Sequence, residues 1–81
     1  MRLDKYLKVS RLIKRRTVAN EACDAGKVLV NGKVARASYD VKEGDVIAVT
    51  LGAKSVTVKV TQVREVVRKE DAASMYEPVL S

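Results

Sequence analysis

A run of three cations stands immediately before a helix-like segment, in the order Lys14, Arg15, Arg16 and then Thr17. The first turn of a helix leaves backbone N–H groups unpaired and carries the positive end of the helix dipole, so it favours an anion. An arginine guanidinium adds a planar fork that binds phosphate through two hydrogen bonds and stacks on bases. The spacing therefore predicts a phosphate-binding cradle at this turn. A charged turn that only faces water is the alternative.

Other cations extend this basic region across the N-terminal half. Residues 1–36 carry ten Lys or Arg against three Asp or Glu, a net charge of +7, whereas residues 37–81 carry six against seven, a net charge of −1, in agreement with the total of +6. This asymmetry indicates a polyanion partner, because solubility alone does not require it. Guanidinium groups that pointed in divergent directions, or that were tied up by the chain's own carboxylates, would overturn this interpretation. The cations predicted at the start or on the outward face of the first helix are Arg2, Lys5, Lys8 and Arg11.

No catalytic or metal-binding pattern accompanies the cations. The 81 residues include no His, so general-base chemistry would fall to carboxylates or lysines, which show no diagnostic spacing. Cys23 is the one cysteine, and its place beside an apolar stripe favours packing over nucleophilic attack. Tyr6, Tyr39 and Tyr76 could stack on bases, but core or rim positions explain them equally well. We therefore expect a non-enzymatic protein without a cofactor or a metal ion.

The first element that must position the cations is an amphipathic helix over residues 2–13. At 100° per residue its inward positions fall within one arc of about 120°, the pattern of a helix with one buried face. The residues of that arc are Leu3, Tyr6, Leu7, Ser10 and Ile13. Asp4 and Lys8 are four residues apart, and we expect them to form a weak pair.

A second helix is predicted from Thr17 to Ala25, with Thr17 as the N-cap and Gly26 as the left-handed terminator. Its predicted inner stripe is Val18, Ala22 and Ala25, flanked by Ala19 and Cys23, and its outward residues are Asn20, Glu21 and Asp24. The order of helix, basic turn and helix is similar to a DNA-reading helix-turn-helix. That function is disfavoured, because the two outward acids would repel the phosphates that flank a groove.

From Lys27 onward the apolar period changes to two, which indicates strands. Asn31-Gly32 separates two short β-like runs and predicts a type I′ hairpin, since both central residues of that turn need positive φ. The next predicted elements are a turn at 43–45, a strand to Leu51, a turn at 52–54 and a strand that bulges or ends near Thr61-Gln62. A short helix is then predicted over 69–75, and regular structure should end at Pro78.

These segments resemble the S4 RNA-binding domain family, also called the alpha-L motif. The resemblance rests on "RLDKYL", "RRTVANEACDAGKVLVNGK" and "VKEGDVI", and it covers residues 2–50 of a single domain spanning 1–81, with 51–81 as a strand and tail. It implies an α+β fold in which two N-terminal helices pack on a small, mostly antiparallel twisted sheet of four to five strands. The RNA-contacting residues that it implies are Arg2, Lys5, Arg15, Arg16, Thr17, Lys27, Asn31 and Lys33, to which the charge pattern adds Lys8, Arg11 and Lys14. Arg15 departs from the family, in which many members place Ser.

Within the family, the chain resembles the compact stand-alone members that associate with ribosomes in quality control. That resemblance implies rRNA of the large ribosomal subunit and peptidyl-tRNA as partners, together with an Rqc-H-type factor that adds untemplated alanine tails to stalled chains. We expect a cytoplasmic monomer without membrane contact, since no apolar run approaches the length of a membrane span. The alternative that stays open is a protein-interaction adaptor whose RNA contact is secondary. An enzyme, or an appendage of one such as a pseudouridine synthase, is disfavoured, because 81 residues leave no room for that catalytic domain.

Overall fold

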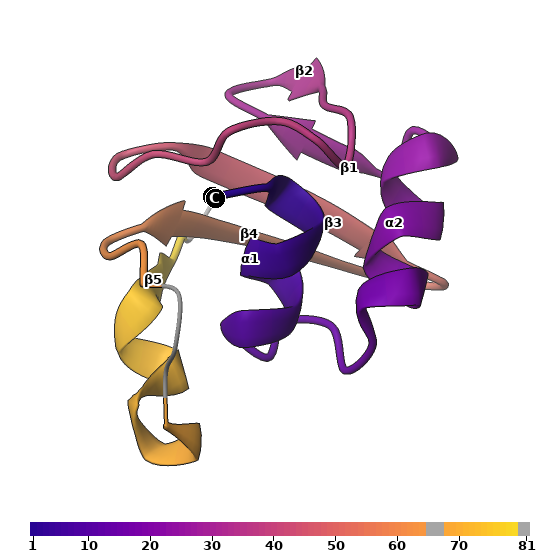
Figure 1. The fold of residues 1–81 in the computed structure, drawn as a ribbon. Coiled ribbons are helices and arrows are strands. Elements are labelled where there is room, and N and C mark those ends of the chain that lie inside the picture. The colour runs from indigo at the N-terminus through magenta and orange to yellow at the C-terminus, as the bar shows by residue number, and fades with distance from the viewer. Residues whose placement is uncertain (65–67, 80–81) are drawn as a thin grey trace.

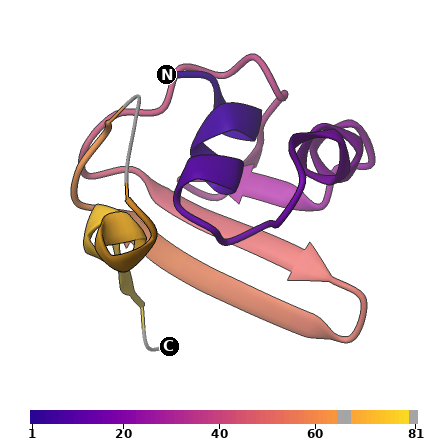
Figure 2. The same ribbon diagram turned by 60° about the horizontal axis from the view of Figure 1, so that its bottom comes forward.

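The computed structural model of the chain describes residues 1–64 and 68–79. Two helices lie over one face of a five-stranded antiparallel sheet whose strand order is β2-β1-β3-β4-β5 (Figures 1 and 2). This arrangement confirms the predicted fold class. The elements are α1 (Leu3–Val9), α2 (Arg16–Asp24), β1 (Val28–Val30), β2 (Lys33–Val34), β3 (Val46–Leu51), β4 (Lys54–Val60), the 3₁₀ helix η1 (Lys69–Met75) and β5 (Tyr76–Pro78).

Helix α1 ends at Val9, four residues before its predicted end. The helix stops because Arg11 adopts a left-handed backbone conformation, with φ of 64°, which few residues other than glycine adopt. The turn then directs Ile13 back toward the helix, and the N–H of Ile13 donates to the carbonyl of Leu7 at 3.0 Å. Ile13 is therefore buried as predicted, although it lies outside the helix.

Helix α2 begins at Arg16, and its N-cap is Arg15, whose side chain makes no capping hydrogen bond. The predicted capping role of Thr17 is therefore wrong. The predicted inner stripe is also wrong in part, because Val18 and Ala25 are exposed. The buried residues of α2 are Ala19, Ala22 and Cys23. These side chains are small, and they let α1 and α2 pack closely, as a larger valine would not.

The C-terminal end of α2 confirms Gly26 as the predicted terminator, with φ of 73°. The N–H of Gly26 donates to the carbonyl of Cys23, and the N–H of Lys27 donates to the carbonyl of Ala22. These two bonds form a Schellman motif, which satisfies carbonyls that the helix leaves unpaired. The chain consequently turns directly from α2 into β1.

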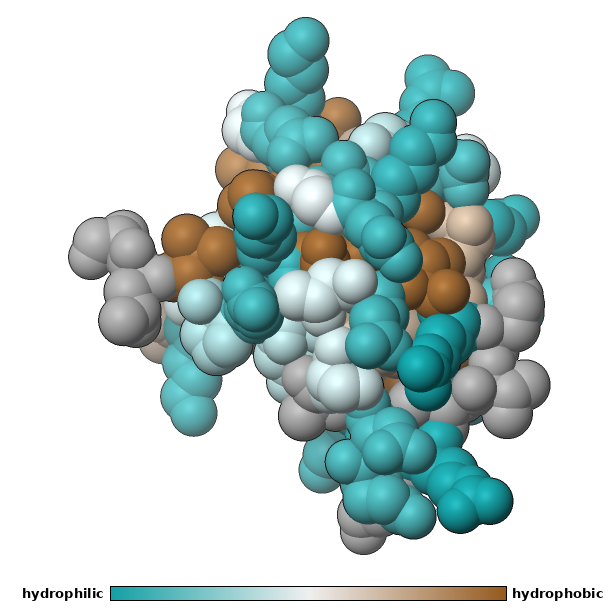
Figure 3. Space-filling model, turned by 90° about the vertical axis from the view of Figure 1, so that its left-hand side faces the viewer, coloured by the Kyte–Doolittle hydropathy of each residue, from teal (hydrophilic) through white to brown (hydrophobic). Residues whose placement is uncertain are grey.

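The sheet turns one apolar face toward the helices. The side chains of that face that are buried in the core are Val28, Val30, Ile47, Val49, Val58 and Val60. The predicted hairpin between β1 and β2 is confirmed, because Asn31 and Gly32 both have positive φ, 53° and 83°. Seen from the side of η1 and β5, most projecting side chains are hydrophilic, with small hydrophobic patches between them (Figure 3).

The C-terminal segment packs back against the sheet. Strand β4 ends at Val60, close to the predicted break, and the N–H groups of Thr61 and Gln62 both donate to the carbonyl of Met75. Pro78 is the last residue of β5, where regular structure was predicted to end, and it lies opposite Val58. A proline is tolerated there because β5 is an edge strand. Within residues 1–64 and 68–79, no helix has the length and apolar character to cross a membrane.

Candidate nucleic-acid interface

Asp4 is a buried carboxylate, with 2% of its surface exposed. Its Oδ1 accepts a hydrogen bond from the backbone N–H of Lys5 at 2.8 Å, and its Oδ2 accepts one from the side-chain amide of Asn20 at 3.3 Å. Two arginines complete its surroundings, Arg2 immediately before α1 and Arg16 at the start of α2. These contacts replace the weak pair with Lys8 that the spacing predicted.

The two arginines reach Asp4 from different helices. Arg2 places Nε 3.2 Å from Oδ1 and Nη2 3.4 Å from Oδ2, while Arg16 places Nε 3.4 Å from Oδ2. About half of each arginine side chain stays exposed, 52% for Arg2 and 47% for Arg16. One carboxylate offsets only one of the two positive charges. The condition that would overturn a polyanion partner, guanidinium groups tied up by the chain's own carboxylates, is therefore met in part for Arg2 and Arg16. The shared contact also holds the two guanidinium groups near each other.

The charge of Asp4 is maintained by its hydrogen bonds. Burial by itself would raise the pKa of this carboxyl, because a charged group loses solvation in the interior. Hydrogen bonds from Asn20, Arg2, Arg16 and the N–H of Lys5 outweigh that effect and lower the pKa below its ordinary value. Asp4 is consequently ionised at neutral pH and holds both arginines.

The start of α1 is anchored to a loop of the β half. The N–H of Leu3 donates to the carbonyl of Tyr39 at 2.8 Å, and the N–H of Asp4 donates to the carbonyl of Ala37 at 3.2 Å. An isolated bridge between Arg2 and Asp40 continues the pairing. These bonds bring the residue before α1 beside the loop that follows β2, so that segments more than thirty positions apart in the sequence share one surface.

Three adjoining hollows run across this surface. The first lies between Asp4, Arg16 and Asn20, and Asn20 also lines the second hollow together with Arg2 and Arg36. Arg36 in turn lines the third hollow, which continues to Lys33 and Tyr39. We call the four cations along these hollows the cationic track: Arg2, Arg16, Lys33 and Arg36. A continuous series of hollows bordered by cations has the form expected for a path along a phosphate backbone.

Acidic residues border the same hollows on the side of α2. Glu21 lines the first hollow and Asp24 lines the second. Both residues are exposed, as the sequence predicted for the outward face of this helix. This placement further disfavours insertion of α2 into a DNA groove, because each carboxylate would approach phosphates.

The predicted RNA-contacting residues divide into two groups. Those that line the three hollows are Arg2, Arg16, Thr17, Asn31 and Lys33. The other six lie elsewhere. Four of them are exposed on α1 or on the turn after it, namely Lys8, Arg11, Lys14 and Arg15. Lys5 is half-buried, and Lys27 lines a separate hollow with Val18 and Leu51. RNA contact by any of the eleven stays a prediction.

Arg36 is a residue of the track that motif reasoning missed. It follows β2 by two positions, in a loop whose irregular sequence offers no periodic signal. Only its contribution to the charge of residues 1–36 pointed to it. Arg36 lies near Arg2 only because the N-terminal residues pair with the loop that follows β2, and sequence patterns do not report such a tertiary contact.

Asn31 has an internal role as well as a place on the rim. Its side-chain amide donates to Asp45 Oδ1 at 3.1 Å, and its Oδ1 accepts from the N–H of Val46 at 3.0 Å. Asp45 also accepts from the hydroxyl of Tyr39 at 3.0 Å and from the N–H of Lys42 at 3.0 Å. This network ties the β1–β2 hairpin and the loop before β3 together, and it fixes the third hollow.

The thiol of Cys23 is unsuited to nucleophilic attack, and the described residues form no group of metal ligands. Cys23 is buried, and burial together with the nearby charges of Asp4 and Asp24 raises the pKa of its thiol to about 11. The thiol is therefore protonated at neutral pH and is a poor nucleophile. Among the residues that the structure describes, no three His, Cys, Asp or Glu side chains are grouped in a way that could hold a metal ion.

Comparison with known sequences supports an RNA-related site. The S4 domain family matches residues 1–47. The chain is 60% identical over 77 residues to a protein of Halalkalibacterium halodurans named RQC P-site tRNA stabilizing factor, covering 95% of this chain and 88% of that protein. A Bacillus subtilis protein of the same name is 57% identical over 76 residues, covering 94% of this chain and 88% of the relative.

Comparison with solved structures gives the same architecture. The trimeric structure of Vibrio cholerae Heat Shock Protein 15 matches with a TM-score of 0.91 and 30% identity, covering 98% of this chain and 81% of that one. The solution structure of the hypothetical protein HP1423 matches with a TM-score of 0.83 and 32% identity, covering 100% and 99% of the two chains.

Proposed function

We propose that this chain, which belongs to the S4 domain family, is a non-enzymatic RNA-binding factor of ribosome quality control. In the finer form of the proposal, it binds rRNA and peptidyl-tRNA on stalled large ribosomal subunits in the cytoplasm. There it assists an Rqc-H-type factor in adding alanine to the C-terminus of the nascent chain. The relatives named RQC P-site tRNA stabilizing factor support this role through their high identity over nearly the whole chain.

The observation that carries the proposal is the contact that Arg2 and Arg16 both make with the Asp4 carboxylate. A flexible arginine loses side-chain entropy when it binds a phosphate. Arg2 and Arg16 are already ordered by Asp4, so less of that entropy remains to be lost. A pair of half-exposed, prearranged guanidinium groups suits recognition of folded RNA by the positions of its phosphates rather than by its bases.

The α2 start adds a second source of attraction for phosphate. No side chain caps the first turn of this nine-residue helix, so its N–H groups and dipole are open to an external anion. Arg15, Arg16 and Thr17 surround this turn and are all exposed. A protein with these features can hold two RNA elements in a fixed relation without chemical catalysis, which is the action that the proposal requires.

A salt series tests the RNA-binding proposal. The dissociation constant is measured for large ribosomal subunits that carry peptidyl-tRNA, at several salt concentrations. If about six phosphates are neutralised, the logarithm of the association constant should fall with the logarithm of the salt concentration with a slope of roughly −4 to −5. A slope near zero would remove the proposal. Subunits without peptidyl-tRNA form the control, and equal affinity for both would restrict the partner to rRNA.

A reconstituted tailing reaction tests the finer proposal. Stalled large subunits, charged alanyl-tRNA and the Rqc-H-type factor are incubated with and without this protein, and the length of the alanine tails is measured. We expect longer tails when the protein is present and no tails when the Rqc-H-type factor is omitted. Unchanged tail length would separate RNA binding from any part in tailing.

The monomeric state remains a prediction, because the Vibrio cholerae relative is trimeric.

A protein-interaction adaptor is the second candidate, and one specific observation favours it. Val18 on α2 and Leu51 at the end of β3 line one hollow, and both are exposed, 41% and 37%. Val56 on the neighbouring strand is also 40% exposed. Such side chains can bury apolar area against a protein partner. Affinity capture after nuclease treatment distinguishes the candidates, since partners retained without RNA favour the adaptor and partners lost with the RNA favour the first proposal.

A further inference from the structure

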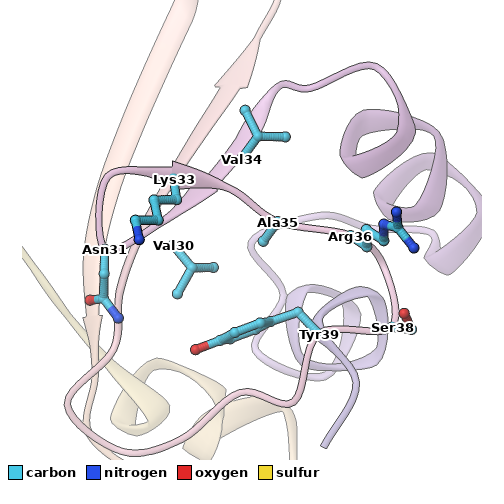
Figure 4. A pocket seen from close by; sticks show the side chains of 8 residues that line it. All are labelled: Val30, Asn31, Lys33, Val34, Ala35, Arg36, Ser38 and Tyr39. Carbon is cyan, nitrogen blue, oxygen red and sulfur yellow. The ribbon is translucent and has the colours of Figure 1, made fainter.

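The third hollow, between the β1–β2 hairpin and the following loop, has a volume of about 640 Å³. Val30, Val34 and Ala35 form apolar parts of its lining, and the ring of Tyr39 lies along it (Figure 4). Lys33 stands on the hairpin side and Arg36 on the side of α2. The hollow therefore combines an apolar interior with a cation at each end.

Tyr39 is held in place by hydrogen bonds of its hydroxyl and of its backbone. Its hydroxyl donates to Asp45 Oδ2 at 3.0 Å, and its backbone N–H donates to the carbonyl of Arg36 at 3.0 Å. Its own carbonyl accepts from the N–H of Leu3. The residue is only partly buried, so a fixed aromatic surface remains open to the hollow. A fixed ring offers stacking area without further loss of side-chain freedom.

The chemistry of the hollow selects for a particular ligand. A planar apolar group can occupy the space beside Tyr39, and the cations at the two ends favour negative charge on both sides of that group. A nucleotide within an RNA strand has this form, because its base is flanked by a phosphate in each direction. The base must be unpaired, since a base inside a duplex is stacked and cannot enter a hollow.

We propose that this hollow binds one unstacked nucleobase of RNA, which stacks on Tyr39 while Lys33 and Arg36 contact the adjoining phosphates. The proposal rests on the RNA-binding function proposed above and deepens it. The cationic track would then hold the strand by its phosphates, and the hollow would favour RNA in which a loop, bulge or end supplies a free base at the right position.

The protein side of the test compares two RNAs of equal length, a hairpin with an unpaired loop and a fully paired duplex. We expect the unaltered protein to prefer the hairpin. The variant Tyr39→Leu should weaken hairpin binding by about 5- to 100-fold and leave duplex binding within about twofold. Tyr39→Phe should restore the preference, because the ring remains. Tyr76→Leu is the matched control, since Tyr76 lies in β5 and is also partly buried.

The RNA side of the test leaves the protein unchanged. Each loop nucleotide of the hairpin is replaced in turn by an abasic nucleotide, and the dissociation constant is measured. One position should reproduce the loss caused by Tyr39→Leu, and at that position the protein variant should cause no further loss. Equal effects at all positions, or an unchanged preference in Tyr39→Leu with a normal melting temperature, would overturn the base site. Failure of the unaltered protein to bind either RNA would instead overturn the RNA-binding function itself.

Discussion

Asp4 Oδ2 lies 3.4 Å from Nε of Arg16, so a buried carboxylate on α1 holds the first residue of α2. This contact crosses the basic turn that separates the two helices. It explains how a run of like charges is accommodated without a nearby acid in the turn itself. The same carboxylate also holds Arg2, so two cations from separate helices share one internal anchor.

Replacing Asp4 by Asn should weaken RNA binding although it removes a negative charge. The net charge would rise from +6 to +7, which by long-range attraction alone would strengthen binding to a polyanion. We expect about a tenfold loss instead, because Arg2 and Arg16 lose the charged partner that orders them, and one charge-assisted hydrogen bond contributes about 1.5 kcal/mol. Titration with a fixed RNA at constant salt measures the change.

Asp24→Asn is the matched control for that variant. It makes the same charge change at an exposed position of α2, and we expect slightly tighter binding. If Asp4→Asn strengthened binding as much as Asp24→Asn, the ordering role of Asp4 would be refuted. Urea unfolding of both variants verifies that they are folded at the temperature of the titration.

The stability that Asp4 provides should disappear in acid. The pKa of Asp4 is lowered in the folded state, so its contribution is fully present above the pKa of the unfolded chain, about 3.9, and is lost as the pH falls through the lower folded value. The difference in unfolding free energy between the unaltered protein and Asp4→Asn should therefore be constant from pH 7 to about pH 5 and shrink below about pH 4. Urea unfolding at each pH measures it.

That comparison isolates Asp4 from the other carboxyl groups. The pKa of Asp45 is also lowered, because hydrogen bonds from Lys42, Asn31 and Tyr39 outweigh the effect of its burial. Since Asp45 is present in both proteins, its contribution cancels in the difference. A difference that grew in acid would contradict the assigned direction of the Asp4 shift.

Arg16→Ala should weaken association with large ribosomal subunits more than Lys59→Ala does. Arg16 belongs to the cationic track, whereas Lys59 is an exposed cation on β4. We expect about a tenfold loss for Arg16→Ala and less than a twofold loss for Lys59→Ala, with the salt slope reduced by about one for the former. Co-sedimentation over a range of protein concentrations supplies both numbers. Equal losses would show that only total charge matters.

Arg36→Ala should weaken RNA binding more than Lys14→Ala. The run of cations in the sequence gives Lys14 the greater weight, but Lys14 lines none of the three hollows, whereas Arg36 lines two of them. The two substitutions change the net charge equally, so their ratio depends on position alone. Affinity for one structured RNA at one salt concentration measures that ratio. A larger loss of affinity for Lys14→Ala would contradict the cationic track and would indicate that RNA contacts the turn between α1 and α2.

The sequence predicted those parts of the fold that short-range chemistry determines. Asn31 and Gly32 need positive φ, and Gly26 ends α2, because these residue types tolerate the left-handed conformation. The early end of α1 could not be predicted in this way, since Arg11 adopts the same conformation without a residue type that favours it. Strand β5 was missed because its partner β4 is distant in sequence and Pro78 is a poor indicator of a strand.

The site was predicted in composition more than in arrangement. Arg2 and Arg16 were identified from motif and charge, and both lie on the track. The role of Asp4 was missed because a local partner at the right spacing, Lys8, seemed sufficient. Asp4 has two charged partners, Arg2 nearby in the sequence and Arg16 twelve positions away, and Asp4 and Arg16 meet only when α1 and α2 pack together. The periodicity of apolar residues indicates which face of a single helix is buried, but it carries no information on contacts between residues of two helices.

The bond between Tyr6 and Met75 bears on how this domain can be transplanted into other proteins. The hydroxyl of Tyr6 donates to the carbonyl of Met75 at 2.7 Å, and both residues are fully buried. The S4 match ends at residue 47, so a graft cut at that boundary would leave the phenol without its acceptor and would remove Val49, Val58, Val60 and Met75 from the core. A fusion protein that is meant to keep the cationic track correctly positioned must therefore also include the residues after 47, up to and including β5.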